Sequence, residues 1–528
     1  MSILLHRQHR SIWIFLLIGI LIRVWNIGDP IIDAMYPRQG QTADAVRSLI
    51  EEPGIQLDSN ASWRGTEPAR IIQELPVYSY ITQGLYEVLA WGAFTPSSPK
   101  PGGADPSLID IAGRLVSILF WAISFLLVQM LWARFLTVRE AFWANGVFVF
   151  APLSVFYGQA VMLEMVFLSV CLTFVLAVLR YSEKPTMLRF ALLAFFAMLG
   201  CLMKFPPFSL LGLLAIAILW RSQGFKFLFR PVHFLGAILV VAAMKVWSGY
   251  VTSTNMAAFS FWTSEESLRL FLGTFHERIA PGMYVRIAAY IATLILSPAG
   301  VIFATAGLFH AWKRKSSEAG FFVLAWCGCL VAFVLIWGAA TASKHSYYNL
   351  PFLAPSAMLL AMGIVPFIDW LHSRCTPIRT RALIAVLVVA ILFPMALMSA
   401  YLFREDKVLL VAVDWIKANV PAGEPIAVKL NHRSQTIEYM HIPIVGYYSG
   451  RPCFMLTEGT PVGEYDLGLR QCRYVVETLP EKPDVMLGLA IWIKGAERQP
   501  DPLTKVKGAG FVAGVPLQSG IRIWAKPD

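Results

Sequence analysis

The chain has 528 residues, of which 57% are hydrophobic and only 15% are charged, and its formal net charge is +11 at pH 7. This composition is typical of a polytopic membrane protein and excludes an ordinary soluble domain. The basic residues gather in short loops between apolar runs and not in a stripe interleaved with aromatic residues, which argues against nucleic-acid binding.

The first apolar run, residues 12–22, follows a short basic stretch that contains Arg7 and Arg10. This arrangement is typical of a signal peptide, but no small-x-small cleavage site comes after it. Arg23 and Trp25 instead suit the membrane interface. We therefore expect an uncleaved first span with a cytoplasmic N-terminus.

Ten further apolar runs have the length of membrane spans or nearly so. They cover residues 111–133, 141–158, 161–179, 187–203, 206–220, 231–250, 285–311, 319–339, 347–369 and 381–402. Alternate loops hold most of the basic residues, so the positive-inside rule places these loops on the cytoplasmic side. Segment 75–94 would reverse every later loop if it crossed the membrane, and it contains Gln83 and Glu87. We predict that this segment is an amphipathic helix in the outer interface.

This topology predicts a polytopic α-helical membrane protein with about eleven spans. Residues 1–402 form the membrane domain, and its loop 28–110 lies outside the cytoplasm. The tail, residues 403–528, contains a short helical pattern, a Pro-Gly turn and several strand-like runs, which predict a small extracytoplasmic α/β domain. In such a compartment Cys453 and Cys472 can form a disulfide, and the sequence leaves their pairing open.

The loop after the first span holds the densest group of polar residues in the chain, including Asp33 and residues 37–44 (PRQGQTAD). A carboxylate such as Asp33, held near the membrane surface, is well placed to act as a general base on an acceptor hydroxyl. The planar guanidinium of Arg38 suits a phosphate, because it binds two oxygens at once. Solvated side chains on an exposed interfacial helix explain the same residues equally well.

Further charged residues lie at the outer ends of later segments. Glu74 precedes the interfacial helix, where an acid is favourable in any case. Glu164 lies just inside an apolar run, which favours a polar cavity, whereas Lys204 can extend its side chain to the interface. Lys344 and His345 head the next-to-last run and suit a phosphate, although the tyrosines after them also suit an aromatic belt.

In their order and topology, these segments resemble the C-type glycosyltransferases, which are multi-pass enzymes that use polyprenyl-phosphate sugars. Within this class the chain is similar to the bacterial branch of protein O-mannosyltransferases and lipid A aminoarabinose transferases. The resemblance covers residues 1–402. Its landmarks in chain order are PRQGQTADAVRSL, ELPVYSYI, GRLVSILF, APLSVFYGQAVMLE, MKFPP and KHSYYNLPFLAP.

The resemblance implies that a sugar is transferred, with inversion, to an acceptor hydroxyl at the outer face of the membrane. On the matching positions it makes Asp33 the base, with Asp44 in reserve, and it assigns Arg38 and Lys204 to the donor phosphate. The remaining residues assigned to substrate binding are Gln39, Thr42, Glu74, Tyr78, Glu164, Lys344, His345 and Tyr347.

The chain departs from many members of the class at one place. Those members carry an Asp-Glu pair near the position of Arg38 and Gln39, and this chain does not. The sequence therefore leaves a divalent metal open without indicating one, and no cofactor is certain from it. No GxSxG, Walker, HExxH or Rossmann glycine motif is present either.

The expected partners are a polyprenyl-phosphate-linked sugar, the lipid bilayer and an acceptor in the cell envelope. Undecaprenyl phosphate is the expected carrier if the source is bacterial, and the bacterial inner membrane is then the expected location. Lipopolysaccharide, lipid A, another envelope glycan and protein hydroxyls all remain acceptors to consider. A lipid or glycan transporter and a non-catalytic envelope-assembly protein are the alternatives. The sequence shows no sign of the inverted repeats or broken midplane helices that a transporter should have.

Overall fold

The structure is a computed structural model of the chain. It describes residues 2–52, 54–61, 70–72, 74–93, 104–258, 272–338, 345–404, 407–421, 423–430, 443–456, 472, 474–478, 512–518 and 521–525.

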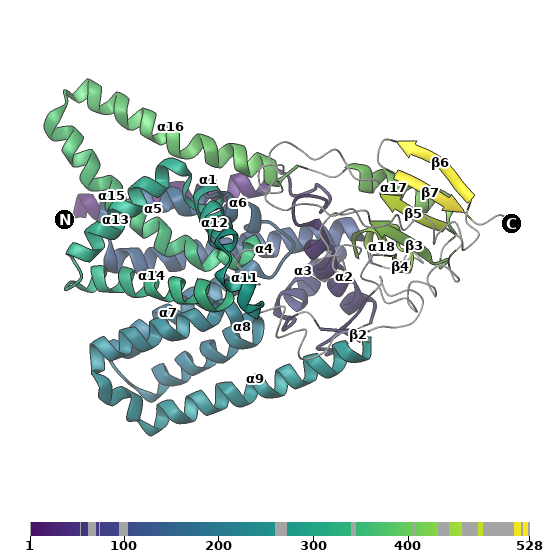
Figure 1. The fold of residues 1–528 in the computed structure, drawn as a ribbon, viewed down its shortest axis with the longest axis horizontal. Coiled ribbons are helices and arrows are strands. Elements are labelled where there is room, and N and C mark those ends of the chain that lie inside the picture. Colours follow the sequence, from purple (N-terminus) through teal and green to yellow (C-terminus); the bar gives the residue numbers. More distant parts are fainter. Residues whose placement is uncertain are drawn as a thin grey trace.

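Helices account for most of the described chain (Figure 1). The longer ones are α1 (Ser2–Val24), α2 (Tyr36–Glu51), α3 (Val77–Ala93), α4 (Pro106–Phe135), α5 (Val138–Phe150), α7 (Glu164–Glu183), α8 (Met187–Gln223), α9 (Pro231–Ala258), α12 (Pro281–Tyr290), α13 (Pro298–Lys313), α14 (Glu318–Trp337), α15 (Leu353–Arg374), α16 (Pro377–Leu402) and α17 (Lys407–Asn419). Shorter ones are α6 (Pro152–Tyr157), η1 (Phe225–Phe229), α11 (Phe275–Ile279), η2 (Ile291–Leu296), η3 (Ser346–Phe352) and α18 (Pro443–Ser449).

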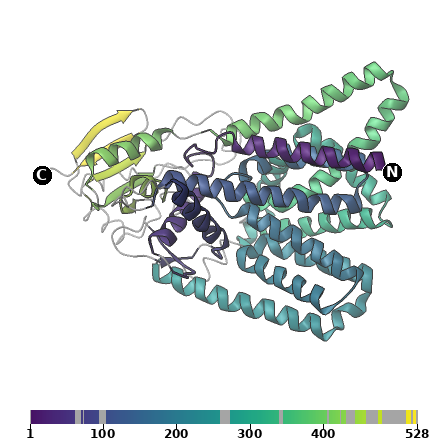
Figure 2. The same ribbon diagram turned by 180° about the vertical axis from the view of Figure 1, so that it is seen from behind.

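Most of the helices run side by side in a bundle, and the C-terminal strands lie beyond one end of it, with α2 and α3 in between (Figures 1 and 2). Within the described residues, seven helical segments are long and apolar enough to cross a membrane, or eight if one bent pair counts as a span. The seven are α4, α7, α8, α9, α14, η3 with α15, and α16. The chain is therefore a membrane protein with several spans, while the total of about eleven stays a prediction.

Helix α8 joins two of the predicted runs, 187–203 and 206–220, across a sharp bend. The bend is at Lys204, whose backbone angles (φ −158°, ψ 83°) are not helical, and two prolines follow it. A Cβ placed on Gly200 would lie 2.1 Å from Cε2 of Phe208. Residues eight apart in a straight helix are about 12 Å apart, so this contact requires the two arms of α8 to fold toward each other. Lys204 therefore lies at the apex of the bend.

Two other predicted spans are also interrupted at prolines. The run 141–158 is divided between α5 and α6, because Ala151 (φ −55°, ψ 128°) leaves the helical region just before Pro152. The run 285–311 bends by 99° at Ser297, which has a φ of 63° and whose hydroxyl accepts the N–H of Gly300 at 3.2 Å. These breaks are local consequences of X-Pro sequences, which disfavour a helical residue before the proline.

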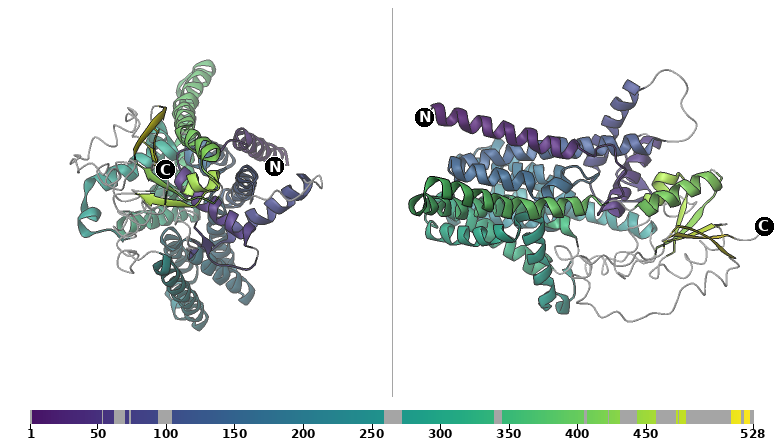
Figure 3. Two further views of the ribbon diagram at one scale, coloured as in Figure 1. Left: turned by 90° about the vertical axis from the view of Figure 1, so that its right-hand side faces the viewer. Right: turned by 90° about the horizontal axis from the view of Figure 1, so that it is seen from above.

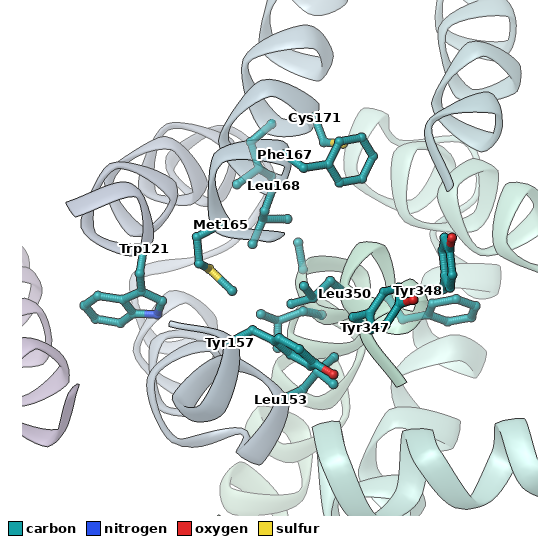
Figure 4. Close-up of a cluster of buried hydrophobic side chains, with 14 of the residues drawn as sticks. Trp121, Leu153, Tyr157, Met165, Phe167, Leu168, Cys171, Tyr347, Tyr348 and Leu350 are labelled. Carbon is teal, nitrogen blue, oxygen red and sulfur yellow. The ribbon is translucent and has the colours of Figure 1, made fainter. Parts of the chain in front are cut away.

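Aliphatic and aromatic side chains together fill the centre of the bundle, and Figure 4 shows part of this core between Trp121 and the pair Tyr347 and Tyr348. Arg23, at the end of α1, is fully buried against it, with its guanidinium carbon 3.7 Å from the Trp121 ring centroid. The guanidinium also donates to the Val149 carbonyl at 3.3 Å. The arginine predicted at the membrane interface therefore binds α1 to the bundle through cation–π and hydrogen-bond contacts.

The tail contains the predicted α/β elements. Helix α17 leads into a five-stranded sheet with the order β4-β3-β5-β7-β6, seen beyond the bundle in Figure 3. The strands are β3 (Ile426–Leu430), β4 (Cys453–Leu456), β5 (Tyr474–Thr478), β6 (Val512–Gln518) and β7 (Ile521–Ala525). Strand β3 pairs in parallel with β4 and β5, and β7 pairs antiparallel with β5 and β6. The boundary at residue 403 and the extracytoplasmic side stay predictions.

The structure also bears on the two cysteines of the tail. Cys453 is a buried free thiol in the described structure, so it does not form a disulfide with Cys472. The sheet explains why: Cys453 and Tyr474 both pair with Ile426, from opposite sides. Strand β3 therefore lies between the two cysteine-bearing segments, and two strand spacings of about 4.8 Å exceed the Cα separation that a disulfide spans.

The bend in α8 leads to a stability prediction. Gly200→Ala should destabilise the protein by about 1–3 kcal/mol, because the new Cβ overlaps the buried Phe208 ring. Gly212→Ala is the matched control on the other arm of α8, since nothing lies within 4 Å of its Cβ position. Alanine has the higher helix propensity, so this control should be neutral or stabilising. Melting temperatures in one detergent test the pair, and equal values would contradict the bend.

Candidate active site

Helix α2 presents two sets of polar side chains to different neighbours. It begins after Met35 with Pro37 in its first turn, where proline is well accommodated. Arg38 and Thr42 lie one turn apart, and the Thr42 hydroxyl donates to the Arg38 carbonyl at 3.0 Å. Asp44 and Arg47 form an ion pair of 2.5 Å one turn further on. The segment that the sequence singles out is therefore an ordered helix packed against α3, α4 and α18, and not an exposed one.

Four charged side chains from distant parts of the chain meet at one end of the bundle. Arg38 pairs with Glu74, and Lys204 pairs with Glu164 and lies 3.6 Å from Glu74. We call Arg38, Glu74, Glu164 and Lys204 the charge cluster. The Glu164 and Lys204 side chains are only 2% and 4% exposed. Buried charges of this kind require partners, and the cluster balances two cations with two anions.

Aromatic residues form one wall of the charge cluster. The Lys204 ammonium lies 4.4 Å from the ring centroid of Tyr347 and 5.2 Å from that of Tyr348. His345 stacks on Tyr347 with their centroids 5.2 Å apart, and Tyr157 meets the same ring edge-on at 6.3 Å (Figure 4). The negative ring faces of the tyrosines attract the ammonium, so η3 helps to hold Lys204 in place.

The neighbouring charges of the cluster set the protonation states of Glu74 and Arg38, its two more exposed members. Burial raises the pKa of Glu74, but the cations Arg38 and Lys204 outweigh it and bring the pKa of this carboxyl below its usual value. Burial lowers the pKa of Arg38, but Glu74 and the other nearby acidic groups outweigh it and raise that pKa. Both groups are therefore charged at neutral pH.

A pocket opens beside the cluster between α2, α3 and the segment before α3. Its polar lining includes Thr42, Ser59, Glu74 and Tyr78, and its apolar lining includes Leu163. Glu74 belongs to both the pocket and the charge cluster. The Tyr78 hydroxyl is already engaged, since it donates to the Gly113 carbonyl at 2.8 Å. This bond joins α3 to α4 beside the pocket that Tyr78 lines, and contact between Tyr78 and a substrate stays a prediction.

Asp33 lies just before Arg38 in the sequence, but its side chain has partners outside the charge cluster. Gln39 donates its side-chain N–H to the Asp33 carboxylate and accepts the Val161 N–H at 2.8 Å. Arg114, in α4, approaches the other carboxylate oxygen at 3.8 Å. Asp33 is only 4% exposed. Gln39, which holds the candidate base, directly follows Arg38, the candidate phosphate ligand, in α2.

Asp44, the reserve base, faces a different part of the molecule. Its partner Arg47 donates to the backbone carbonyls of Gly446 and Tyr447 in α18, at 3.4 and 3.2 Å. Asp44 is thus placed to orient Arg47 at the contact between α2 and the tail. This position favours a structural role for Asp44. The assignment of Lys344 cannot be placed, because this residue lies outside the described part of the chain.

Two ionisable residues near the site are absent from the sequence-based set. Asp110 and Arg114 lie one turn apart in α4, where they are 3% and 0% exposed. Ionisable residues inside an apolar helix are rare and usually functional. The i, i+4 spacing of Asp110 and Arg114 at the start of the run 111–133 is therefore the sequence pattern that indicates them. Among the described residues no group of three or more His, Cys, Asp or Glu side chains could hold a metal ion.

No family model matches the sequence, and no curated protein matches it. Solved structures do match. A structure of ArnT from Cupriavidus metallidurans bound to undecaprenyl phosphate is 13% identical, with a TM-score of 0.59, and the match covers 98% of this chain and 99% of that one. A structure of archaeal oligosaccharyltransferase AglB from Archaeoglobus fulgidus, in complex with an inhibitory peptide and a dolichol-phosphate, is 13% identical, with a TM-score of 0.56. This match covers 89% of this chain and 69% of that one. Both are C-type glycosyltransferases.

The chain has the C-type glycosyltransferase fold. This confirms the fold that the sequence motifs predict, in a chain whose sequence matches no family model. The match to ArnT extends over nearly the full length of both chains, so it includes the tail as well as the bundle. At 13% identity the similarity establishes the fold alone, and the roles of individual residues rest on the geometry above.

The charge cluster leads to a second prediction. Lys204→Met should destabilise the protein by about 3–5 kcal/mol, because it leaves the Glu164 carboxylate buried without its partner. Adding Glu164→Gln to Lys204→Met should recover much of this loss, since no buried charge is then left unpaired at that position. Arg139→Met is the control: its ion pair with Asp369 is more than half exposed and should contribute almost nothing. Thermal unfolding of the three variants and the wild type tests this, and an unchanged Lys204→Met would contradict it.

Proposed function

We propose that this protein is a membrane glycosyltransferase that moves a sugar from a polyprenyl-phosphate donor to a hydroxyl group of a cell-envelope acceptor. The observation that carries the proposal is the pairing of two cations, the partly buried Arg38 and the buried Lys204, with acids that a phosphate can replace, at one end of a C-type bundle. The structural neighbours support the donor class, since ArnT is bound to undecaprenyl phosphate and AglB to a dolichol-phosphate.

In the proposed reaction, the acceptor oxygen attacks the anomeric carbon as the bond from that carbon to the donor phosphate breaks. The acceptor hydroxyl loses its proton to the base, and the polyprenyl phosphate leaves with the electron pair of the broken bond. Attack from the side opposite the leaving group inverts the anomeric centre. The products are the glycosylated acceptor and a polyprenyl phosphate.

The charge of the phosphate changes during this reaction, and this change gives Arg38 and Lys204 their role. The donor is a phosphodiester with one negative charge, whereas the leaving group is a phosphomonoester that develops a second one. Cations that are already in place stabilise the transition state more than the ground state when charge develops beside them. We propose that the phosphate takes the place of Glu74 on Arg38, because Glu74 is the more exposed acid of the charge cluster and borders the pocket.

Asp33 is the proposed base. Gln39 and Arg114 hold its carboxylate from two sides, and a fixed orientation is what a general base needs. Gln39 also joins this carboxylate to the backbone before α7, and α7 begins with Glu164. The proposed base therefore shares its supporting elements with the phosphate ligands. This sharing fixes the position of the base relative to the leaving phosphate.

The proposed setting is the periplasmic side of a bacterial inner membrane, with an envelope glycan, lipid A or a protein as acceptor. The positive-inside pattern supports this orientation, because it places the charge cluster and the tail on the side opposite the basic loops. His345, Tyr347 and Thr42 line or border the site and are proposed to contact the substrate.

Asp33→Asn tests the base. The variant should lower kcat by about 10²–10⁴-fold, because the amide cannot accept the acceptor's proton. The affinity for polyprenyl phosphate should stay near that of the wild type, since Asp33 acts on the acceptor. Asp369→Asn, which changes an exposed carboxylate outside the site in the same way, is the control and should keep the activity. Radiolabelled sugar transfer from a polyprenyl-phosphate donor measures turnover. Activity that survives Asp33→Asn but is lost in Asp44→Asn would move the base to Asp44.

Arg38→Gln tests the phosphate site. Loss of a charge-assisted contact should weaken binding of undecaprenyl phosphate by about tenfold to a hundredfold. The shift in melting temperature with added lipid measures the affinity, and Arg139→Gln on the exposed surface is the control. Equal affinity in the two variants would exclude Arg38 as a phosphate ligand. Mass spectrometry of the lipids that co-purify with the wild type would identify the carrier and the sugar.

A further inference from the structure

We propose that Tyr448, in the C-terminal tail, is a positioning residue that holds the backbone next to Asp33, so that the active site is complete only when the tail is docked. The catalytic part of this proposal rests on the proposed function, and the structural part does not. It concerns three segments that are far apart in the sequence: residues 29–33, the start of α4, and α18.

The Tyr448 hydroxyl uses both of its hydrogen-bonding capacities at this junction. It accepts the backbone N–H of Ile31 at 2.7 Å and donates to the Asp110 carboxylate at 2.5 Å. Ile31 and Ile32 are fully buried. A buried backbone N–H needs a partner, and for Ile31 the tail supplies it from 417 residues away.

Helix α4 contacts segment 29–33 at a second point. Asp110, which binds Tyr448, and Arg114 are one turn apart and so lie on the same face of α4. Arg114 donates to the Asp29 carbonyl at 3.2 Å and lies 3.8 Å from the Asp33 carboxylate. The segment that ends in the proposed base is therefore held from both sides, by Arg114 directly and by Asp110 through Tyr448.

Neighbouring contacts show that α18 is seated tightly on the membrane part of the chain. A Cβ on Gly40 of α2 would lie 3.1 Å from the backbone nitrogen of Ile444, so the two backbones approach each other closely. Arg47, oriented by Asp44, donates to two carbonyls of α18. The Tyr447 hydroxyl lies 2.9 Å from the Asp110 carboxylate and 2.8 Å from the Pro106 carbonyl. These contacts dock the tail, and of the two tyrosine hydroxyls that of Tyr448 extends the docking to Ile31.

The two neighbouring tyrosines therefore provide a matched pair of variants. Tyr447→Phe and Tyr448→Phe each remove one hydroxyl that binds Asp110, and each keeps its aromatic ring. Only Tyr448→Phe also removes the acceptor for the Ile31 N–H. A role in docking alone predicts similar effects for the two variants, whereas a positioning role predicts a larger effect for Tyr448→Phe.

The test combines hydrogen–deuterium exchange with kinetics on the full-length protein in detergent. In Tyr448→Phe, peptides that contain Ile31 should exchange at least tenfold faster than in the wild type, while in Tyr447→Phe they should exchange near the wild-type rate. Turnover should follow the same order: Tyr448→Phe should lower kcat at least tenfold with little change in the KM for the donor, and Tyr447→Phe should stay within about threefold of the wild type.

Unchanged exchange at Ile31 in Tyr448→Phe would overturn the proposal, and so would equal loss of kcat in the two variants. If Tyr448→Phe does not fold, the wild-type protein still decides the structural part, because a freely exchanging Ile31 amide would contradict the contact. A wild-type protein that neither binds polyprenyl phosphate nor transfers sugar would instead overturn the proposed function. The exchange comparison would then still report on Tyr448.

Discussion

The structure of the site depends on the need to pair charges that are buried near the membrane. Glu164 and Lys204 are almost completely shielded from water, and neither could be tolerated alone. Their pairing brings the start of α7 to the apex of the bend in α8, and Glu74 and Arg38 add the segment before α3 and the first turn of α2. One electrostatic requirement thus joins four elements at the same end of the bundle.

The same requirement is the basis of the phosphate binding that we propose. The charge cluster is neutral as a whole without substrate, because each cation has a carboxylate beside it. A phosphate offers the same chemistry as a carboxylate, with more oxygens and more charge, so it can take the place of one acid without leaving a cation unpaired. The bend in α8 and the tyrosines of η3 keep Lys204 in position during such an exchange, because they fix its backbone and its ammonium separately.

Helix α2 connects this chemistry to the tail. Arg38 belongs to the charge cluster and Gln39 binds Asp33, while Arg47, two to three turns later and paired with Asp44, contacts α18. Displacement of the tail would therefore be transmitted to both halves of the site through one short helix. Tyr448 provides a more direct route to segment 29–33. The sequence predicts the tail as a separate small domain. In the structure the tail also helps to support the segment that carries the proposed base.

The sequence by itself determined the membrane class and the fold class, and it singled out most of the charged residues of the candidate site. These properties follow from local features of the sequence. The features are the length of the apolar runs and the presence of acidic and basic residues in segments where the bilayer tolerates few charges. Only the tertiary structure decided the partners: Arg38 with Glu74, Lys204 with Glu164, and Arg47 with the tail. Asp110 and Tyr447 are 337 residues apart, and no local pattern relates them. Pairing depends on which helix ends meet, and that is set by the packing of the whole chain.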